Sequence, residues 1–160
     1  MGCRRLTLLA AVLLLGACSG NDVQTEEAVT VEFRHSGCGR ENEVKSDAFV
    51  NETPELTLEY TEEGLLITRT NAMLNCSIIQ GGISCDLSVE NNIITYRAYE
   101  TDGPTLKCVC PVKTMTALVG GLKEDTEYIL HYTCDGQYLP LNFRYAKGLK
   151  ITFDLSLYRE

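Results

Sequence analysis

The chain has no tryptophan, only two histidines and few basic residues for its length. Its 160 residues include 14 lysines and arginines against 22 aspartates and glutamates, a formal net charge of −8. Nucleic acids and anionic membrane surfaces attract basic proteins, so this balance argues against both as electrostatic partners. The missing tryptophan also weakens the case for an aromatic platform that stacks on sugars.

No apolar run is long enough to cross a membrane. The longest one, residues 6–17, has 12 residues and follows the basic pair Arg4-Arg5, whereas a membrane-crossing helix needs about 20. A basic start and a short apolar run are typical of a secretory signal. The sequence therefore predicts an exported protein.

The apolar run ends in Leu15-Gly16-Ala17-Cys18, which resembles the lipobox of bacterial lipoproteins. The resemblance implies that residues 1–17 are removed and that Cys18 receives lipid, which would anchor the chain firmly to a membrane. Ser19 by the same resemblance implies the outer membrane, on either its periplasmic or its cell-surface face. Residues 18–27 are then a polar, acidic tether.

Six cysteines remain once Cys3 in the signal and Cys18 under lipid are set aside. Outside the cytoplasm, an even number predicts a disulfide framework. The candidates are Cys38, Cys76, Cys85, Cys108, Cys110 and Cys134. Cys108 and Cys110 lie two apart on a predicted strand, too poorly directed to bond each other. We expect Cys76 and Cys85 to pair with them in either order, and Cys38 to pair with Cys134.

Alternating apolar and polar residues dominate the rest of the chain. The clearest case is Leu149, Ile151, Phe153, Leu155 and Leu157, and such alternation is typical of strands with one buried face. With turn signals between them, nine strands are predicted at 28–34, 55–61, 65–75, 84–89, 93–100, 109–119, 126–134, 139–145 and 149–158. The predicted fold is one all-β, antiparallel, disulfide-braced sandwich over residues 28–160, with 36–54 as a loop pinned by Cys38.

Residues 121–130 resemble the turn between two strands of fibronectin type III domains. The resemblance implies an immunoglobulin-like or fibronectin-like sandwich with a tyrosine corner, in which the Tyr128 hydroxyl hydrogen-bonds to backbone upstream. Leu122 would then plug the core. Asn75-Cys76, the Cys108-Val109-Cys110 run and this corner together are similar to a group of small Bacteroides lipoproteins without assigned activity. That likeness implies an envelope location and supplies no catalytic residue.

No constellation of catalytic or metal-binding residues is recognisable in the sequence. His35 follows a predicted strand, and His131 falls on the wetter face of another, so the two histidines are isolated. No zinc, calcium or phosphate-loop pattern is present. The sequence therefore predicts no enzyme, no metal and no cofactor.

The leading hypothesis is a lipid-anchored, non-enzymatic binding or structural module with a protein or glycan partner. Its candidate contact loops are residues 102–104 and the segment 135–138, which includes Gln137 and Tyr138. One alternative is an envelope thiol–disulfide enzyme that uses Cys108 and Cys110. Another is a small inhibitor or immunity lipoprotein.

Overall fold

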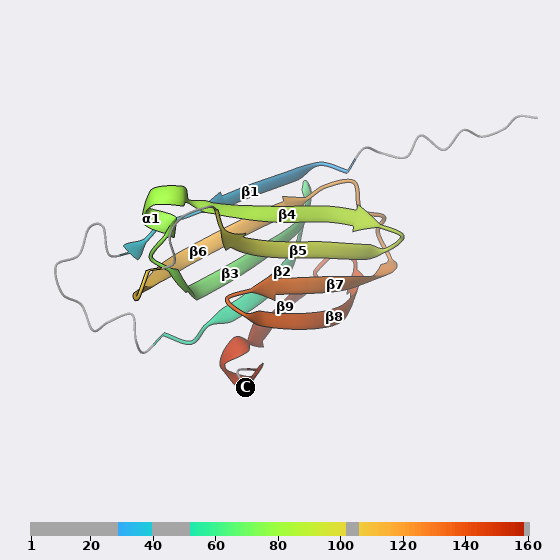
Figure 1. Cartoon of the computed structure of the whole chain (residues 1–160). Helices are drawn as coiled ribbons and strands as arrows, with labels where there is room; N and C mark the ends of the chain where they lie inside the picture. The colour runs from blue at the N-terminus through green and yellow to red at the C-terminus, as the bar shows by residue number, and fades with distance from the viewer. Residues whose placement is uncertain (1–28, 40–51, 102–105, 159–160) are drawn as a thin grey trace, which may run out of the picture.

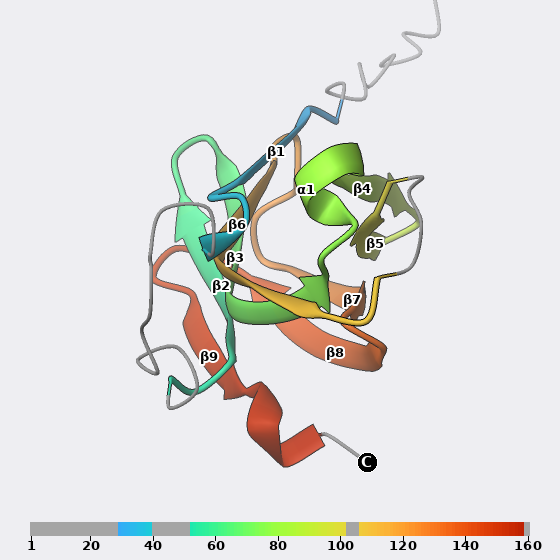
Figure 2. The same ribbon diagram turned by 60° about the vertical axis from the view of Figure 1, so that its left-hand side comes forward.

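The computed structural model describes residues 29–39, 52–101 and 106–158, and these form two β-sheets. One sheet has five strands and the other four, and they pack face to face (Figures 1 and 2). The chain is therefore an all-β sandwich, as the alternating pattern predicts. Within the described residues, no helix is long and apolar enough to cross a membrane.

The five-stranded sheet is antiparallel throughout. Its strands, in spatial order, are β1 (Val31–His35), β6 (Val109–Val119), β3 (Gly64–Asn75), β2 (Glu55–Thr61) and β9 (Lys150–Asp154). The longest of these, β3 and β6, are neighbours, and β1 flanks β6 on its other side. β6 is thus held between a strand from the start of the described chain and one from its middle.

The four-stranded sheet is mixed, which corrects the expectation of a wholly antiparallel fold. Its order is β4 (Ile83–Glu90), β5 (Ile93–Glu100), β7 (Thr126–Cys134) and β8 (Gln137–Tyr145). β5 and β7 pair in parallel. Parallel neighbours need a crossover connection, and here β6 is that crossover, because the chain runs through the opposite sheet between β5 and β7.

The core lies between the sheets and follows the predicted alternation. On β7, Tyr128, Leu130 and Tyr132 are buried, while the alternate residues Ile129, His131 and Thr133 lie on the outer face. Tyr96 of β5 is fully buried and stacks on Tyr132, with ring centroids 5.3 Å apart. Strand period therefore decides which aromatic rings form the core.

The end of the chain departs from the prediction of one strand over 149–158. β9 ends at Asp154, and Leu155–Tyr158 form a short 3₁₀ helix, η3. The Asp154 carboxylate accepts hydrogen bonds from the backbone N–H and hydroxyl of Ser156 at 2.9 and 2.6 Å. Such local bonds compete with the strand ladder. Leu155 is buried, but Ile151 and Leu157 are 36% and 78% exposed, so the expected burial of these two residues is wrong.

A second departure is a short helix, α1 (Ile78–Gly81), which alternation did not predict. It connects β3 to β4, and so carries the chain from one sheet to the other (Figure 1).

Tyr128 closes the connection between β6 and β7. The backbone N–H of Lys123 donates a hydrogen bond to the Tyr128 hydroxyl at 3.0 Å. This is the upstream backbone contact that the tyrosine-corner motif predicts. Leu122 is half-buried and packs against the core. The corner therefore fixes the point where the chain passes from one sheet to the other.

Removing the Tyr128 hydroxyl should destabilise the fold. In Tyr128→Phe the Lys123 N–H loses its acceptor, and we expect the free energy of unfolding to fall by about 1 kcal/mol. The matched control is Tyr138→Phe, because the Tyr138 side chain is 57% exposed and the change should stay below about 0.5 kcal/mol. Urea unfolding measures both, and equal losses would contradict a structural role for the corner.

Candidate functional site

A groove of about 890 Å³ opens where the β7–β8 turn meets η3. It is lined by residues 135–139, by Leu157 and Tyr158 of η3, and by Met73 and Val109 from the five-stranded sheet. Volumes of roughly 300–1,000 Å³ are typical of ligand sites. The groove therefore has the size of a binding site and is built from both sheets.

Exposed apolar side chains gather at this groove. Val109, Tyr138, Leu157 and Tyr158 line it and are 46%, 57%, 78% and 46% exposed. Single exposed apolar residues are common on protein surfaces, but a cluster of them marks an interaction surface. Sequence reasoning found only Tyr138 of these four, because the other three lie in segments that were predicted to be regular strands.

The Asp135-Gly136 turn sets the orientation of the β8 wall. Both residues have positive φ, 53° and 70°, as a two-residue type I′ hairpin requires, and Asp-Gly is a preferred pair for it. Cys134 and Gln137 face each other across the turn. The tight turn therefore starts β8 at Gln137, so Gln137 points inward and Tyr138 outward.

The two predicted contact residues thus have different roles. The Tyr138 ring stands on the outer face, edge-on to His131 with ring centroids 5.9 Å apart. Gln137 is buried, and its Nε2 donates to the carbonyl of Leu155 at 3.1 Å. It therefore joins β8 to η3 across the base of the groove instead of offering its amide at the surface. The other predicted loop, 102–104, lies outside the described residues.

A buried arginine lies behind the hairpin tip. The Arg69 side chain is fully buried, and its Nη2 is 3.9 Å from the Asp135 carboxylate. Its Nη1 donates to the Thr70 carbonyl at 2.5 Å, while Nε and Nη2 have no hydrogen-bond partner within the described residues. The same Asp135 oxygen accepts from the Met73 backbone N–H at 3.2 Å. Asp135 therefore ties the hairpin tip to β3 and offsets a buried charge.

Arg69 is not among the site residues predicted from the sequence. The signal was present, because Arg69 shares the strand parity of Leu65 and Ile67, and both of these are fully buried. An arginine on an inward-facing position predicts a buried charge that needs a partner.

Neutralising Asp135 should cost more than neutralising a similar exposed residue. We expect Asp135→Asn to lower the free energy of unfolding by about 2 kcal/mol, because the buried guanidinium loses its counter-charge. Asp125→Asn is the matched control: Asp125 also has positive φ, 56°, and its carboxylate is 3.5 Å from exposed Arg144.

Asparagine tolerates positive φ, so neither change strains the backbone. The control should shift stability by less than about 0.5 kcal/mol, as exposed pairs do. Equal shifts for the two variants in urea unfolding would show that the Arg69–Asp135 contact stabilises the fold no more than an exposed ion pair does.

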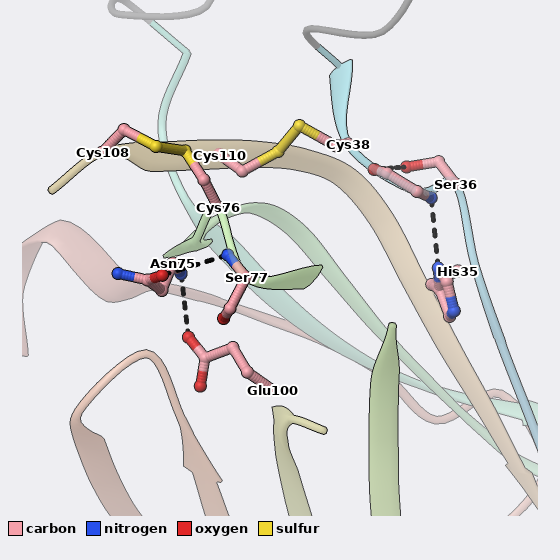
Figure 3. Close-up of a disulfide and its surroundings, with 10 residues drawn as sticks. His35, Ser36, Cys38, Asn75, Cys76, Ser77, Glu100, Cys108 and Cys110 are labelled. Atoms are coloured by element: carbon pink, nitrogen blue, oxygen red, sulfur yellow. Dashed lines mark hydrogen bonds between the residues drawn. A yellow bond between two sulfur atoms is a disulfide. The ribbon is translucent and has the colours of Figure 1, made fainter. Parts of the chain in front are cut away.

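Two disulfides lie near the start of β6. Cys38 is bonded to Cys110 and Cys76 to Cys108, each with a Cα–Cα distance of 5.6 Å (Figure 3). The pairing of Cys76 with Cys108 is one of the two expected orders. The expected bridge between Cys38 and Cys134 is wrong, because Cys134 ends β7 in the opposite sheet.

Within the described residues, Cys85 and Cys134 are unpaired, so the expected bridge from Cys85 to the Cys-x-Cys pair is also wrong. Cys85 is on β4, opposite Ala98 of β5, and β5 separates β4 from β7. Two strand spacings amount to about 9.6 Å, whereas a disulfide spans at most about 6.8 Å between Cα atoms. The two thiols therefore cannot bond each other within this fold.

Neither free thiol is set up as a nucleophile. Burial raises the pKa of Cys85 to about 12 and also raises that of Cys134. Both thiols therefore stay protonated near neutral pH, and the thiol is the weakly reactive form. Cys108 and Cys110 are bonded to two other cysteines, so the Cys-x-Cys pair holds no free thiol for the alternative of thiol–disulfide exchange.

Asn75 explains part of the Asn-Cys pattern. Its Nδ2 donates to the Leu106 carbonyl at 2.7 Å, and its Oδ1 accepts from the N–H groups of Leu106 and Ser77, both at 3.0 Å. The backbone N–H of Asn75 donates to Glu100 at 2.8 Å (Figure 3). Asn75 thus fastens the segment before β6 beside the Cys76–Cys108 bridge.

The two histidines are not brought together. His35 ends β1, where its Nδ1 accepts a hydrogen bond from the Gly37 N–H at 3.1 Å, and His131 is on β7 of the other sheet. Within the described residues, no group of three or more histidine, cysteine, aspartate or glutamate side chains could hold a metal ion.

The chain matches no protein-family model, no curated protein and no solved structure. The likeness to small Bacteroides lipoproteins therefore rests on sequence motifs alone, and the likeness to the fibronectin type III corner rests on its motif and on the Lys123–Tyr128 hydrogen bond.

The bridge pattern predicts how the number of free thiols changes when two cysteines are replaced together. Cys38→Ser with Cys110→Ser removes one complete bridge, so the number of thiols titrated in denaturant without reductant should not change. Cys38→Ser with Cys108→Ser is the control that orphans one partner of each bridge, and two further thiols should appear. Two further thiols in the first double variant and none in the second would show that Cys38 is bonded to Cys108 and not to Cys110.

Proposed function

We propose that the protein is a lipoprotein of the bacterial outer envelope, anchored through Cys18, whose sandwich is a non-enzymatic binding module. The observation that carries the proposal is the groove beside β8, where exposed Val109, Tyr138, Leu157 and Tyr158 gather. Apolar surface of this kind gains stability when a partner covers it. Tyrosine is also a residue that contributes much binding energy at interfaces.

The position of the groove relative to the anchor supports this role. β1 begins at Val31, opposite Val119 at the end of β6, whereas Val109 at the start of β6 lines the groove. These two ends of β6 lie at opposite ends of the sandwich (Figure 1), about 34 Å apart along the strand. A tether from Cys18 would therefore enter the sandwich far from the groove, which would face away from the membrane.

Charge at the tethered end bears on its distance from the membrane surface. The turns at that end carry more acidic than basic side chains, all exposed: Glu62, Glu63, Glu124 and Asp125 against Lys123 and Lys147. Anionic lipid headgroups repel acidic side chains. The tethered end would thus stand off the membrane surface, leaving the groove accessible.

Two variants test the anchor and the groove separately. In cells that export the chain, Cys18→Ala should move it from the membrane fraction to the soluble fraction, because the lipid attachment site is lost. Leu157→Asp should remain in the membrane fraction but lose saturable binding of the purified chain to immobilised Bacteroides outer-envelope proteins and glycans. The control is Val31→Asp, an equally apolar-to-charged change at a 49% exposed residue remote from the groove.

The groove proposal fails if Leu157→Asp and Val31→Asp bind alike. The anchor proposal fails if Cys18→Ala stays with the membrane.

A further inference from the structure

The open edge of β8 runs along the groove. β8 is the last strand of the four-stranded sheet, and within the described residues it pairs only with β7. Its first residues, with the turn before them, form one wall of the groove as residues 135–139. The groove therefore offers strand backbone as well as apolar side chains.

The turn geometry shows which backbone groups face the groove. Cys134 and Gln137 close a two-residue hairpin and so form a hydrogen-bonded pair. Antiparallel ladders alternate hydrogen-bonded with non-hydrogen-bonded pairs, so the N–H and C=O of Tyr138 point away from β7. The next residue whose backbone points away from β7 is Pro140, and proline has no N–H that could be left unpaired.

Resting on the proposed function, we propose that this groove binds an extended peptide segment of a partner protein, which adds as a short strand along β8 at Tyr138. The N–H and C=O of Tyr138 would pair with the peptide backbone, as in other cases of strand addition. Leu157 and Tyr158 of η3, which line the same groove, would contact an apolar side chain of the peptide. Pro140 would end the added ladder after one or two residues.

The lining favours a peptide over a sugar. Sugar sites need several side-chain hydrogen-bonding groups beside an aromatic face, but the side-chain amide of Gln137 is buried and donates to Leu155. Of the other polar side chains in the lining, the Asp135 carboxylate already accepts from the Met73 backbone N–H, which leaves the hydroxyls of Tyr138 and Tyr158. The net charge of −8 further favours the approach of a peptide that carries lysine or arginine near its apolar residue.

The probe is a phage-displayed library of random linear peptides, selected on the purified full chain and followed by affinity measurements with synthetic peptides. We expect selected peptides to share an apolar residue near a lysine or arginine. Tyr138→Pro should bind them about tenfold more weakly than Tyr138→Ala, because only the proline removes the backbone N–H. Asn142→Pro against Asn142→Ala is the matched control, because Asn142 holds an equivalent outward position beyond the groove.

Thermal unfolding confirms that each variant is folded before its affinity is compared. Selected peptides that bind Tyr138→Pro and Tyr138→Ala equally, or a selection that yields no binder, would overturn strand addition. If envelope glycans then bind in a manner that depends on Leu157, the groove remains the binding surface and only the peptide assignment fails. If no ligand depends on Leu157, the proposed function fails as well.

Discussion

The two bonds of the Cys-x-Cys pair are the constraint on which the remaining structure depends. β6 lies between β1 and β3, and its cysteines bond to the chain that follows each neighbour: Cys110 to Cys38 after β1, and Cys108 to Cys76 after β3. These bridges close sequence separations of 72 and 32 residues, each worth about 2–4 kcal/mol. Because β6 is also the crossover between β5 and β7, the bridges fix the start of the strand that carries the chain through the five-stranded sheet.

The same bonds hold one side of the groove in place. Val109 is between the two bonded cysteines, so strand alternation turns its side chain away from both bridges and leaves it exposed. On the other side, Asp135 accepts from the Met73 backbone and faces buried Arg69. Parts of both sheets are therefore fixed before any partner arrives, and a site that is preorganised in this way loses less entropy on binding.

Local pattern predicted the strands well, because alternation and turn residues act within a few positions. Cysteine pairing was not predictable in this way, since it depends on which strands β6 lies between, and six cysteines allow fifteen pairings. The parallel β5–β7 pair is equally non-local. Leu157 misled the prediction because alternation continues in the sequence to residue 157, while the Asp154–Ser156 bonds end the strand three residues earlier.

The edge of β8 is protected at some of the positions whose backbone points away from β7 and is open at others. An unpaired strand edge invites pairing with other chains, and proline or charged side chains on the edge reduce that risk. Pro140 and Arg144 occupy two of these positions, whereas Tyr138 and Asn142 have neither protection. Of these two, only Tyr138 lines the groove, together with exposed Leu157. Protection is thus missing where apolar surface is also uncovered. Both features are explained together if the first residues of β8 have a partner of their own.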